Sequence, residues 1–465
     1  MALDAPVTYD VVIIGAGPGG EDCTTPLLAA GMSVALVEME LVGGECFNWA
    51  CVPSKAMLRS GHALRSAGRL PGAREAITEP LNAAAALSYR DDVVLHHDDH
   101  AVVDDFVDAG AVFIRGRGRL VGPRRVSVAT SDGQLELHAR HAVILATGST
   151  ATIPDIPGLK EAKPWTNREG TSASVAPNKL VVLGGGAVGL ELAQAWRSLG
   201  SREVVVLNRR PGLLPSHEPF VGDLVLEGLL ATGVQVRFGV QPIGVSRQAD
   251  GQLLLALDDG TSELTDELLL AVGKRPATTD LGLETVGLAA GAFVEVDDHM
   301  QSRGHEWLYA IGDVNGRALL THQASYHARI AAASIIATSR GDESDFQDEV
   351  NGRAVPQVIF TDPEVASVGF THEQAVTKGI SARKVEADLG AVLGAQLHAK
   401  GYQGRVSFVI DEDRDVLVGA TFVGQDVADM VHAATIAIVG EVPLRKLRHA
   451  IPSFPTMSEI WLDLQ

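Results

Sequence analysis

This sequence has few cysteines and few aromatic residues. Only 3 of its 465 residues are cysteine, and 5% are aromatic. Such an odd and sparse set of cysteines is unlike the disulfide framework of a small secreted protein. It favours a cytoplasmic chain in which a thiol pair has a chemical role. Cys23 lies alone in a predicted helix and is expected to be a small buried residue without that role.

Positive charge is also scarce. The chain has 38 Lys and Arg against 58 Asp and Glu, a formal net charge of −20. This balance opposes binding to nucleic acid or to anionic membranes, both of which need basic surfaces. No apolar run reaches the length of a membrane span, and the N-terminus lacks the basic and apolar regions of a signal peptide. We therefore expect neither a nucleic-acid nor a membrane partner.

The remaining composition is ordinary for a soluble globular protein, with 46% hydrophobic and 21% charged residues. A chain of 465 residues is too long for a single core. Two to four domains are expected.

The first nucleotide-binding pattern lies at the start of the chain. A buried strand over 9–14 runs into G-x-G-x-x-G, formed by Gly15, Gly17 and Gly20. A helix follows, and a second strand over 33–37 ends at Glu38. The glycines allow a pyrophosphate to approach the helix N-terminus, and Glu38 stands where a carboxylate would hold a ribose hydroxyl.

The same unit recurs after residue 178. A strand over 179–183 precedes a second glycine pattern, a helix and a strand over 203–207, the glycines being Gly184, Gly186 and Gly189. This second strand ends at Arg209 and Arg210 instead of an acid. Guanidinium groups would pair with the 2′-phosphate of an adenosine ribose, so the sequence predicts NADPH. NADH remains possible if both arginines are solvated loop residues.

A pair of cysteines with four residues between them carries the redox chemistry. Gly44 lets the chain bend before Cys46, and Pro53 suits the first turn of a helix that starts near Cys51. A helix N-terminus favours the Cys51 thiolate, and Lys55 adds a cation one turn further on.

Three further buried strands each lead into a segment that contains glycine. The strand over 142–145 leads to Thr147 and Gly148, that over 268–272 leads to Gly273, and that over 307–311 leads to Gly312 and Asp313. Asp313 thus stands just past a strand end, where ligands of open α/β sheets bind. From residue 356 onwards no glycine fingerprint appears, and a helix is expected over 426–438, which indicates an α+β module.

Together these motifs and the C-terminal segment 454–459 resemble the class I pyridine nucleotide-disulfide oxidoreductases. This flavoprotein family includes dihydrolipoamide dehydrogenase, glutathione reductase and mercuric reductase. The resemblance implies an α/β fold with two Rossmann-like dinucleotide-binding domains, for FAD and NAD(P), and a C-terminal α+β dimerisation domain in a homodimer. The implied division is 1–150 and 275–345 for FAD, 151–274 for NAD(P), and 346–465 for dimerisation.

The resemblance also implies roles for particular residues. FAD would pass electrons from NADPH to a Cys46–Cys51 disulfide, with Cys51 as the charge-transfer thiol and Cys46 as the interchange thiol. Lys55 would lie near the flavin and pair with Glu191. The implied catalytic set is Cys46, Cys51, Lys55, Glu191 and Glu459. The implied cofactor-binding set is Gly15, Gly17, Gly20, Glu38, Gly44, Lys55, Thr147, Gly148, Gly184, Gly186, Gly189, Arg209, Arg210, Gly273, Gly312 and Asp313; no metal ligands are expected.

The sequence departs from the family at the substrate end. Phe454 stands where the family has a His that acts with Glu459 as acid and base, and a phenyl ring cannot exchange a proton. His449 or His322 could substitute for it. No Cys follows Cys51, so the C-terminal cysteine pair of mercuric reductase is missing.

Two changes flank the cysteines. Glu45 replaces a Thr and would tend to raise the pKa of Cys46. Trp49 replaces a small residue, and its indole would either pack in the protein or stack on a flat ligand.

The electron acceptor therefore stays open. It is expected to be a small disulfide or another small molecule. A dithiol oxidase, a quinone or metal-ion reductase, a transhydrogenase and a non-enzymatic redox sensor are the alternatives.

Overall fold

A computed structural model describes residues 7–464, so positions 1–6 and 465 of the predicted first and last domains lie outside the described residues. The chain divides into two compact units, each built from three separate stretches. The first unit contains 7–53, 91–151 and 273–351, and the second contains 54–90, 152–272 and 352–464.

The first unit is built on one sheet with the order β3-β2-β1-β6-β5-β4, and β16 pairs with β6. Strands β3, β2, β1, β6 and β16 are mutually parallel, whereas β4 and β5 continue the sheet in antiparallel fashion. The strands are β1 (Val7–Ile14), β2 (Val34–Glu38), β3 (Val112–Arg115), β4 (Arg117–Gly122), β5 (Arg125–Thr130), β6 (Gly133–Leu145) and β16 (Leu308–Ala310).

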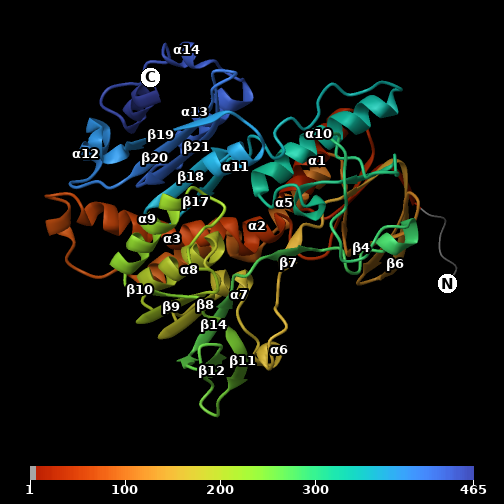
Figure 1. Cartoon of the computed structure of the whole chain (residues 1–465). Helices are drawn as coiled ribbons and strands as arrows, with labels where there is room; N and C mark the ends of the chain where they lie inside the picture. Colours follow the sequence, from red (N-terminus) through yellow and green to blue (C-terminus); the bar gives the residue numbers. More distant parts are fainter. Residues whose placement is uncertain (1–6, 465) are drawn as a thin grey trace. The chain divides into compact units, whose positions relative to one another are not determined.

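Two helices of the first unit, α1 (Pro18–Ala29) and α10 (Thr321–Ser339), run side by side (Figure 1). Their inner faces join the buried core of the central strands, where Cys23 is fully buried. The shorter elements are α2 (Gly44–Trp49), η2 (Leu95–His97), α5 (His100–Asp108), η3 (Leu283–Val286), η4 (Gly312–Asn315) and the two-stranded ribbon of β7 (Ser149–Ala151) and β15 (Lys274–Pro276).

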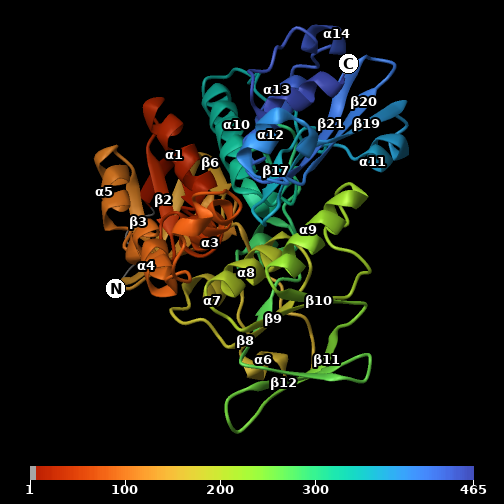
Figure 2. The ribbon, with the colours of Figure 1, turned by 90° about the vertical axis from the view of Figure 1, so that its left-hand side faces the viewer.

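The second unit contains a parallel sheet of order β10-β9-β8-β14. Helices α8 and α9 pack against this sheet (Figure 2). The elements are α6 (Leu159–Ala162), α7 (Asn167–Ser172), β8 (Lys179–Leu183), α8 (Ala187–Ser198), β9 (Glu203–Asn208), α9 (Pro219–Ala231), β10 (Val234–Phe238) and β14 (Glu267–Leu270). An antiparallel sheet of β11 (Pro242–Arg247), β12 (Leu253–Leu257) and β13 (Ser262–Thr265) was not predicted.

The last part of the second unit is an antiparallel sheet of order β17-β18-β21-β20-β19 with helices around it. Its strands are β17 (Gln357–Ile359), β18 (Glu364–Gly369), β19 (Ala382–Asp388), β20 (Arg405–Asp411) and β21 (Val416–Gly424). Its helices are α11 (His372–Thr377), η5 (Leu389–Ala391), α12 (Leu393–His398), α13 (Met430–Val439), α14 (Leu444–Leu447) and η6 (Met457–Leu464).

Helix α3 (Cys51–Gly68) joins the second unit from residue 54, with η1 (Arg74–Ala76) and the start of α4 (Ala83–Val93). Its side chains Met57 and Leu58 belong to the same buried cluster as Trp196 of α8.

The parallel strands at the centre of the first sheet, the parallel sheet of the second unit and the C-terminal α+β module confirm the predicted α/β fold class. One helix boundary was wrong: a helix from residue 426 was expected, but α13 begins at Met430. The reason is local, since Asp426 has a φ of 54° and cannot continue a right-handed helix. Within 7–464, no helix combines the length and the apolar character needed to cross a membrane.

Candidate active site

The two cysteines lie at the junction of two helices in the first unit. Cys46 is in α2 and Cys51 is the first residue of α3, with the break at Ala50. The Thr321 hydroxyl donates a hydrogen bond to Cys46 Sγ at 2.9 Å and lies 3.4 Å from Cys51 Sγ. Thr321 is the first residue of α10, so the N-termini of two helices meet at the pair.

The pKa of Cys46 is raised, first by its hydrogen bond with Cys51, then by burial and by the charge of Cys51. The Thr321 hydroxyl and the Lys274 ammonium act in the opposite direction and lower it. The pair therefore resists carrying two thiolates at once, as is usual for closely coupled acids.

The first glycine pattern forms an open cradle at the N-terminus of α1. A Cβ on Gly15 would lie 2.5 Å from the Ala146 carbonyl oxygen, and one on Gly20 would lie 2.0 Å from the Gly15 carbonyl oxygen. A Cβ on Gly17 would instead meet only Gly44 Cα, at the ordinary contact distance of 3.8 Å. Two glycines are thus required by packing, while Gly17 leaves the helix N-terminus accessible to a phosphate group.

Polar groups of the same unit surround this cradle. The Glu38 carboxylate is buried and accepts the N–H groups of Ala16 and Glu40, both at 2.7 Å. Burial raises its pKa. Thr147 Oγ1 is buried and makes no hydrogen bond with any residue in 7–464. A buried hydroxyl without a partner next to a phosphate cradle fits a bound dinucleotide.

Asp313 lies in η4 and accepts hydrogen bonds from Ser149 Oγ at 2.5 Å and Lys274 Nζ at 3.3 Å. Gly148 and Gly312 have φ values of 67° and 73°, which glycine adopts readily. The predicted positions Thr147, Gly148, Gly312 and Asp313 therefore belong to the first unit.

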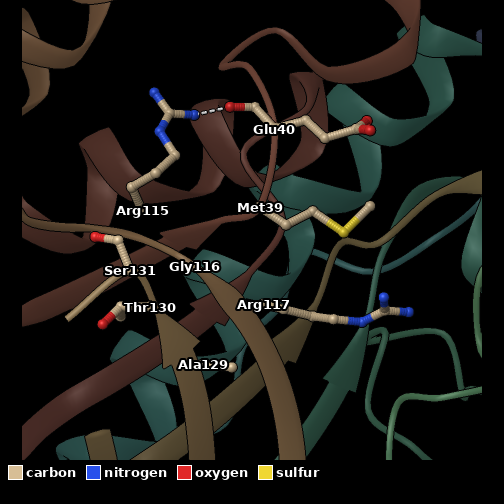
Figure 3. A pocket seen from close by; sticks show the side chains of 8 residues that line it. All are labelled: Met39, Glu40, Arg115, Gly116, Arg117, Ala129, Thr130 and Ser131. Carbon is tan, nitrogen blue, oxygen red and sulfur yellow. Dashed lines mark hydrogen bonds between the residues drawn. The ribbon is translucent and has the colours of Figure 1, made fainter. Parts of the chain in front are cut away.

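A cavity of about 370 Å³ opens beyond the end of β2, just after Glu38 (Figure 3). The Arg115 guanidinium spans its rim, bonded to the Glu40 carbonyl oxygen and to the Asp99 carboxylate. The lining residues are Met39, Glu40, Arg115, Gly116, Arg117, Ala129, Thr130 and Ser131.

The second glycine pattern repeats the geometry of the first. A Cβ on Gly184 would lie 2.4 Å from the Ala271 carbonyl oxygen, and one on Gly189 would lie 2.2 Å from the Gly184 carbonyl oxygen. Gly186 has no heavy atom within 4 Å of its Cβ position. Gly273 follows β14 with a φ of 122°.

The loop after β9 presents its arginines to solvent. Asn208 Nδ2 donates to the carbonyl oxygens of Arg210 at 3.0 Å and Gly212 at 2.9 Å, which holds the loop. Arg209 and Arg210 are exposed. A phosphate group could reach both guanidinium groups there.

Lys55 and Glu191 form an ion pair within the second unit. The distance from Lys55 Nζ to Glu191 Oε2 is 2.6 Å, and the Glu191 side chain is only 4% exposed against 33% for Lys55. The other carboxylate oxygen accepts the Phe360 N–H at 2.8 Å, and the Lys55 ammonium lies 5.1 Å from the centre of the Phe360 ring. The predicted pair thus exists, and a loop far along the chain completes it.

The C-terminal segment contains Phe454, where the resemblance led us to expect a His, and Glu459. Phe454 is 73% exposed, and the Glu459 carboxylate accepts the Thr456 N–H at 3.0 Å. The two alternative histidines, His322 and His449, are exposed.

Trp49 stacks on His97, with ring centres 5.8 Å apart and planes inclined by 19°. One indole face is therefore engaged within the protein. No group of three or more His, Cys, Asp or Glu in 7–464 is arranged to hold a metal ion.

Sequence reasoning missed Thr321. Its signal was weak, because one hydroxyl residue before a predicted helix is common. A stronger clue is that it follows Asp313 at short distance and opens the helix that packs on the first glycine-rich helix.

The chain belongs to the pyridine nucleotide-disulphide oxidoreductases. The model of that family matches residues 9–328, and the model of its dimerisation domain matches residues 355–464. The family binds FAD and uses a pyridine nucleotide.

Individual relatives match almost the whole of this chain. The chain is 33% identical to a dihydrolipoyl dehydrogenase of Thermus scotoductus, over 97% of this chain and 95% of the relative. It is 29% identical to a mercuric reductase of Bacillus cereus, over 97% and 70%. Among solved structures, the Cu(II) complex of the HOCl-induced flavoprotein disulfide reductase RclA from Escherichia coli has the same fold, with a TM-score of 0.85, 24% identity and 98% of each chain covered.

Proposed function

We propose that this chain transfers hydride from NADPH through FAD to the Cys46–Cys51 disulfide, and that the resulting dithiol reduces a small disulfide or another small acceptor. The observation that carries the proposal is the meeting of both sulfur atoms with the Thr321 hydroxyl, in the unit that also holds the first glycine cradle. Segments 1–150 and 275–345 would hold FAD, 151–274 NAD(P), and 346–465 the dimer contact.

The FAD site is supported by groups that a dinucleotide would use. Gly17 leaves the α1 N-terminus accessible, Thr147 has a hydroxyl to offer, and Glu38 can hold a ribose hydroxyl beside the cavity of Figure 3. Bound there, FAD supplies two-electron transfer from the nicotinamide to the sulfur atoms. The residues of the chain would orient the cofactor, and the resemblance implies that Lys55, paired with Glu191, would supply positive charge.

For the nucleotide, we propose a preference for NADPH over NADH. The exposed pair Arg209 and Arg210 and the neutral Asn208 support it, because a 2′-phosphate attracts guanidinium groups and would be repelled by an acid.

Exposed apolar side chains in the dimerisation segment support a homodimer. Ile451 is 87% exposed, Phe454 73% and Ile436 59%. A second copy would remove these surfaces from water.

Anaerobic reduction by NADPH tests the proposed electron path. The FAD-loaded protein should bleach and develop a long-wavelength charge-transfer band, because the Cys51 thiolate would face the flavin. Cys51→Ser should abolish the band, while Cys46→Ser should keep it. A protein that is reduced without any such band would show that the cysteines are outside the path.

An acceptor panel with NADPH and NADH in parallel identifies the product side. It includes disulfides, quinones, Cu(II), Hg(II), oxygen and a second nicotinamide. The Hg(II) and Cu(II) arms are included because a mercuric reductase and a Cu(II) complex are among the relatives. Turnover with oxygen alone would indicate an oxidase, and turnover with none would indicate a redox sensor.

A further inference from the structure

The Thr321 hydroxyl lies where thiol–disulfide exchange needs a group that stabilises a thiolate. In thiol–disulfide exchange the attacking sulfur must be a thiolate, and a neighbouring donor or cation has to stabilise it. Thr321 Oγ1 is 2.9 Å from Cys46 Sγ and 3.4 Å from Cys51 Sγ, so one hydroxyl serves both sulfur atoms. The N-cap residue of α10 is Leu320, and the hydroxyl of Thr321, the next residue, is directed to the sulfur atoms.

We propose that Thr321 is a catalytic residue of this chain, which stabilises the thiolate of the cysteine pair in place of an imidazole, and that the pair is therefore selective for disulfides with acidic leaving thiols. This rests on the proposed function. A hydroxyl has a single proton to donate, and it can rotate toward whichever sulfur is ionised.

The selectivity follows from what a threonine cannot do. Its hydroxyl donates a hydrogen bond, but it does not release its proton near neutral pH as an imidazolium does. The thiol leaving the substrate must therefore depart as a thiolate and take its proton from water. Thiolates of low pKa depart fastest, so aromatic disulfides are favoured over alkyl disulfides.

The exchange balances without a further reactant. The Cys46 thiolate forms a bond to one substrate sulfur, the substrate S–S bond breaks, and the first thiolate leaves. The Cys51 thiolate then attacks Cys46 Sγ, which closes the Cys46–Cys51 disulfide and releases the second thiolate. The dithiol loses two electrons and the disulfide gains them, while the two protons lost by the cysteines go to water and the two product thiolates take protons from it.

Other ionisable groups close to the cysteine pair, in space or in sequence, also have to be considered when Cys46 is titrated. Cys51 raises the pKa of Cys46, whereas Lys274 on β15 lowers it. Glu45 precedes Cys46 in α2, and the exposed His322 follows Thr321 in α10. The experiment must separate Thr321 from His322.

The thiolate is measured directly by alkylation of the full-length, FAD-loaded protein after reduction with dithiothreitol. The rate of iodoacetamide addition to Cys46 is followed by mass spectrometry across a range of pH. Thr321→Val should move the midpoint upward and slow alkylation at neutral pH by roughly 10- to 100-fold, since a hydrogen bond to a charged group is lost. Thr321→Ser should retain the profile of the parent protein.

An unchanged profile in Thr321→Val, or an equal shift in His322→Gln, would overturn the assignment. Cys23 is fully buried and does not interfere with alkylation. This measurement needs neither NADPH nor an acceptor, so it can succeed even if the proposed function fails.

The selectivity is measured with NADPH and disulfides of graded leaving-thiol pKa, from dithiobis(nitrobenzoate) to hydroxyethyl disulfide. The aromatic compound should react at least about 100-fold faster, which is the lower end of what a general acid contributes. Equal rates along the series would refute the selectivity, and no disulfide reduction at all would refute the proposed function.

Discussion

Replacing Lys55 by methionine should destabilise the region around Glu191 by about 2–3 kcal/mol. At the observed 2.6 Å the attraction between the two charges is about 6 kcal/mol at an effective dielectric constant of about 20. Desolvation cancels part of it, and removing one partner of a buried pair costs about 3–5 kcal/mol. The expected loss of stability is smaller than that, because Lys55 is 33% exposed and water screens its charge.

The loss of stability in Lys55→Met comes from the Glu191 carboxylate. It is 4% exposed, so without Lys55 it stays buried with the Phe360 N–H as its remaining partner at 2.8 Å. Glu191→Gln is the milder change, because an amide oxygen can still accept that N–H and the partly exposed Lys55 can turn to solvent. The double variant Lys55→Met with Glu191→Gln removes both charges and should recover most of the loss.

Hydrogen exchange of peptides covering 187–198 and 357–362 is the suitable assay, because a chain of this length need not unfold in one step. Lys55→Met should accelerate exchange there by roughly 30- to 160-fold. Exchange equal to that of the parent protein would refute the reasoning, and so would a double variant as unstable as Lys55→Met.

Three further predictions concern the acceptor, the nucleotide and acid stability. Phe454→His should raise reduction of lipoamide and glutathione disulfide, by up to the roughly 10²–10⁴-fold that general acid–base catalysis supplies, without improving the natural reaction; Phe454→Leu is the control, and a large gain in the natural reaction would contradict it. Arg209→Gln with Arg210→Gln should raise the KM for NADPH about tenfold or more and leave that for NADH unchanged in steady-state assays. Burial lowers the pKa of His327 from 6.5 to about 4. The folded chain thus binds fewer protons than the unfolded chain between these values. The contribution of His327 to the free energy of unfolding is therefore constant above about pH 6.5. As pH drops toward 4, the chain loses up to about 1.4 kcal/mol of stability per pH unit through this residue. Thermal midpoints at several pH values should show a flatter dependence in His327→Gln, and identical slopes would contradict this.

The glycine patterns and most helices and strands could be predicted from the sequence, because they depend on residues close together in the chain or on the adjacent strand. Gly15, Gly20, Gly184 and Gly189 are needed where a Cβ would meet a carbonyl oxygen of the same strand–turn–helix unit or its neighbouring strand. Strand and helix positions followed from apolar runs between turns. The start of α13 was missed because the left-handed φ of Asp426 has no sequence signature.

The candidate site was predictable to the extent that it resembled a known family. The pairing of Lys55 with Glu191 was expected on that ground, but the contribution of Phe360 to both residues was not. The stacking of Trp49 on His97 was also unforeseen, since the sequence left packing and ligand stacking open.

By itself the sequence determined two glycine-rich strand–turn–helix units, a cysteine pair at a helix start, and a phenylalanine at position 454, whose ring cannot exchange a proton. Each of these depends on neighbours within a few residues, or on the identity of one residue. The tertiary structure alone decided which hydroxyl meets the sulfur atoms. Thr321 lies 275 positions from Cys46 in the chain, and only the packing of α10 on the first sheet and its helices brings its hydroxyl to the thiol pair.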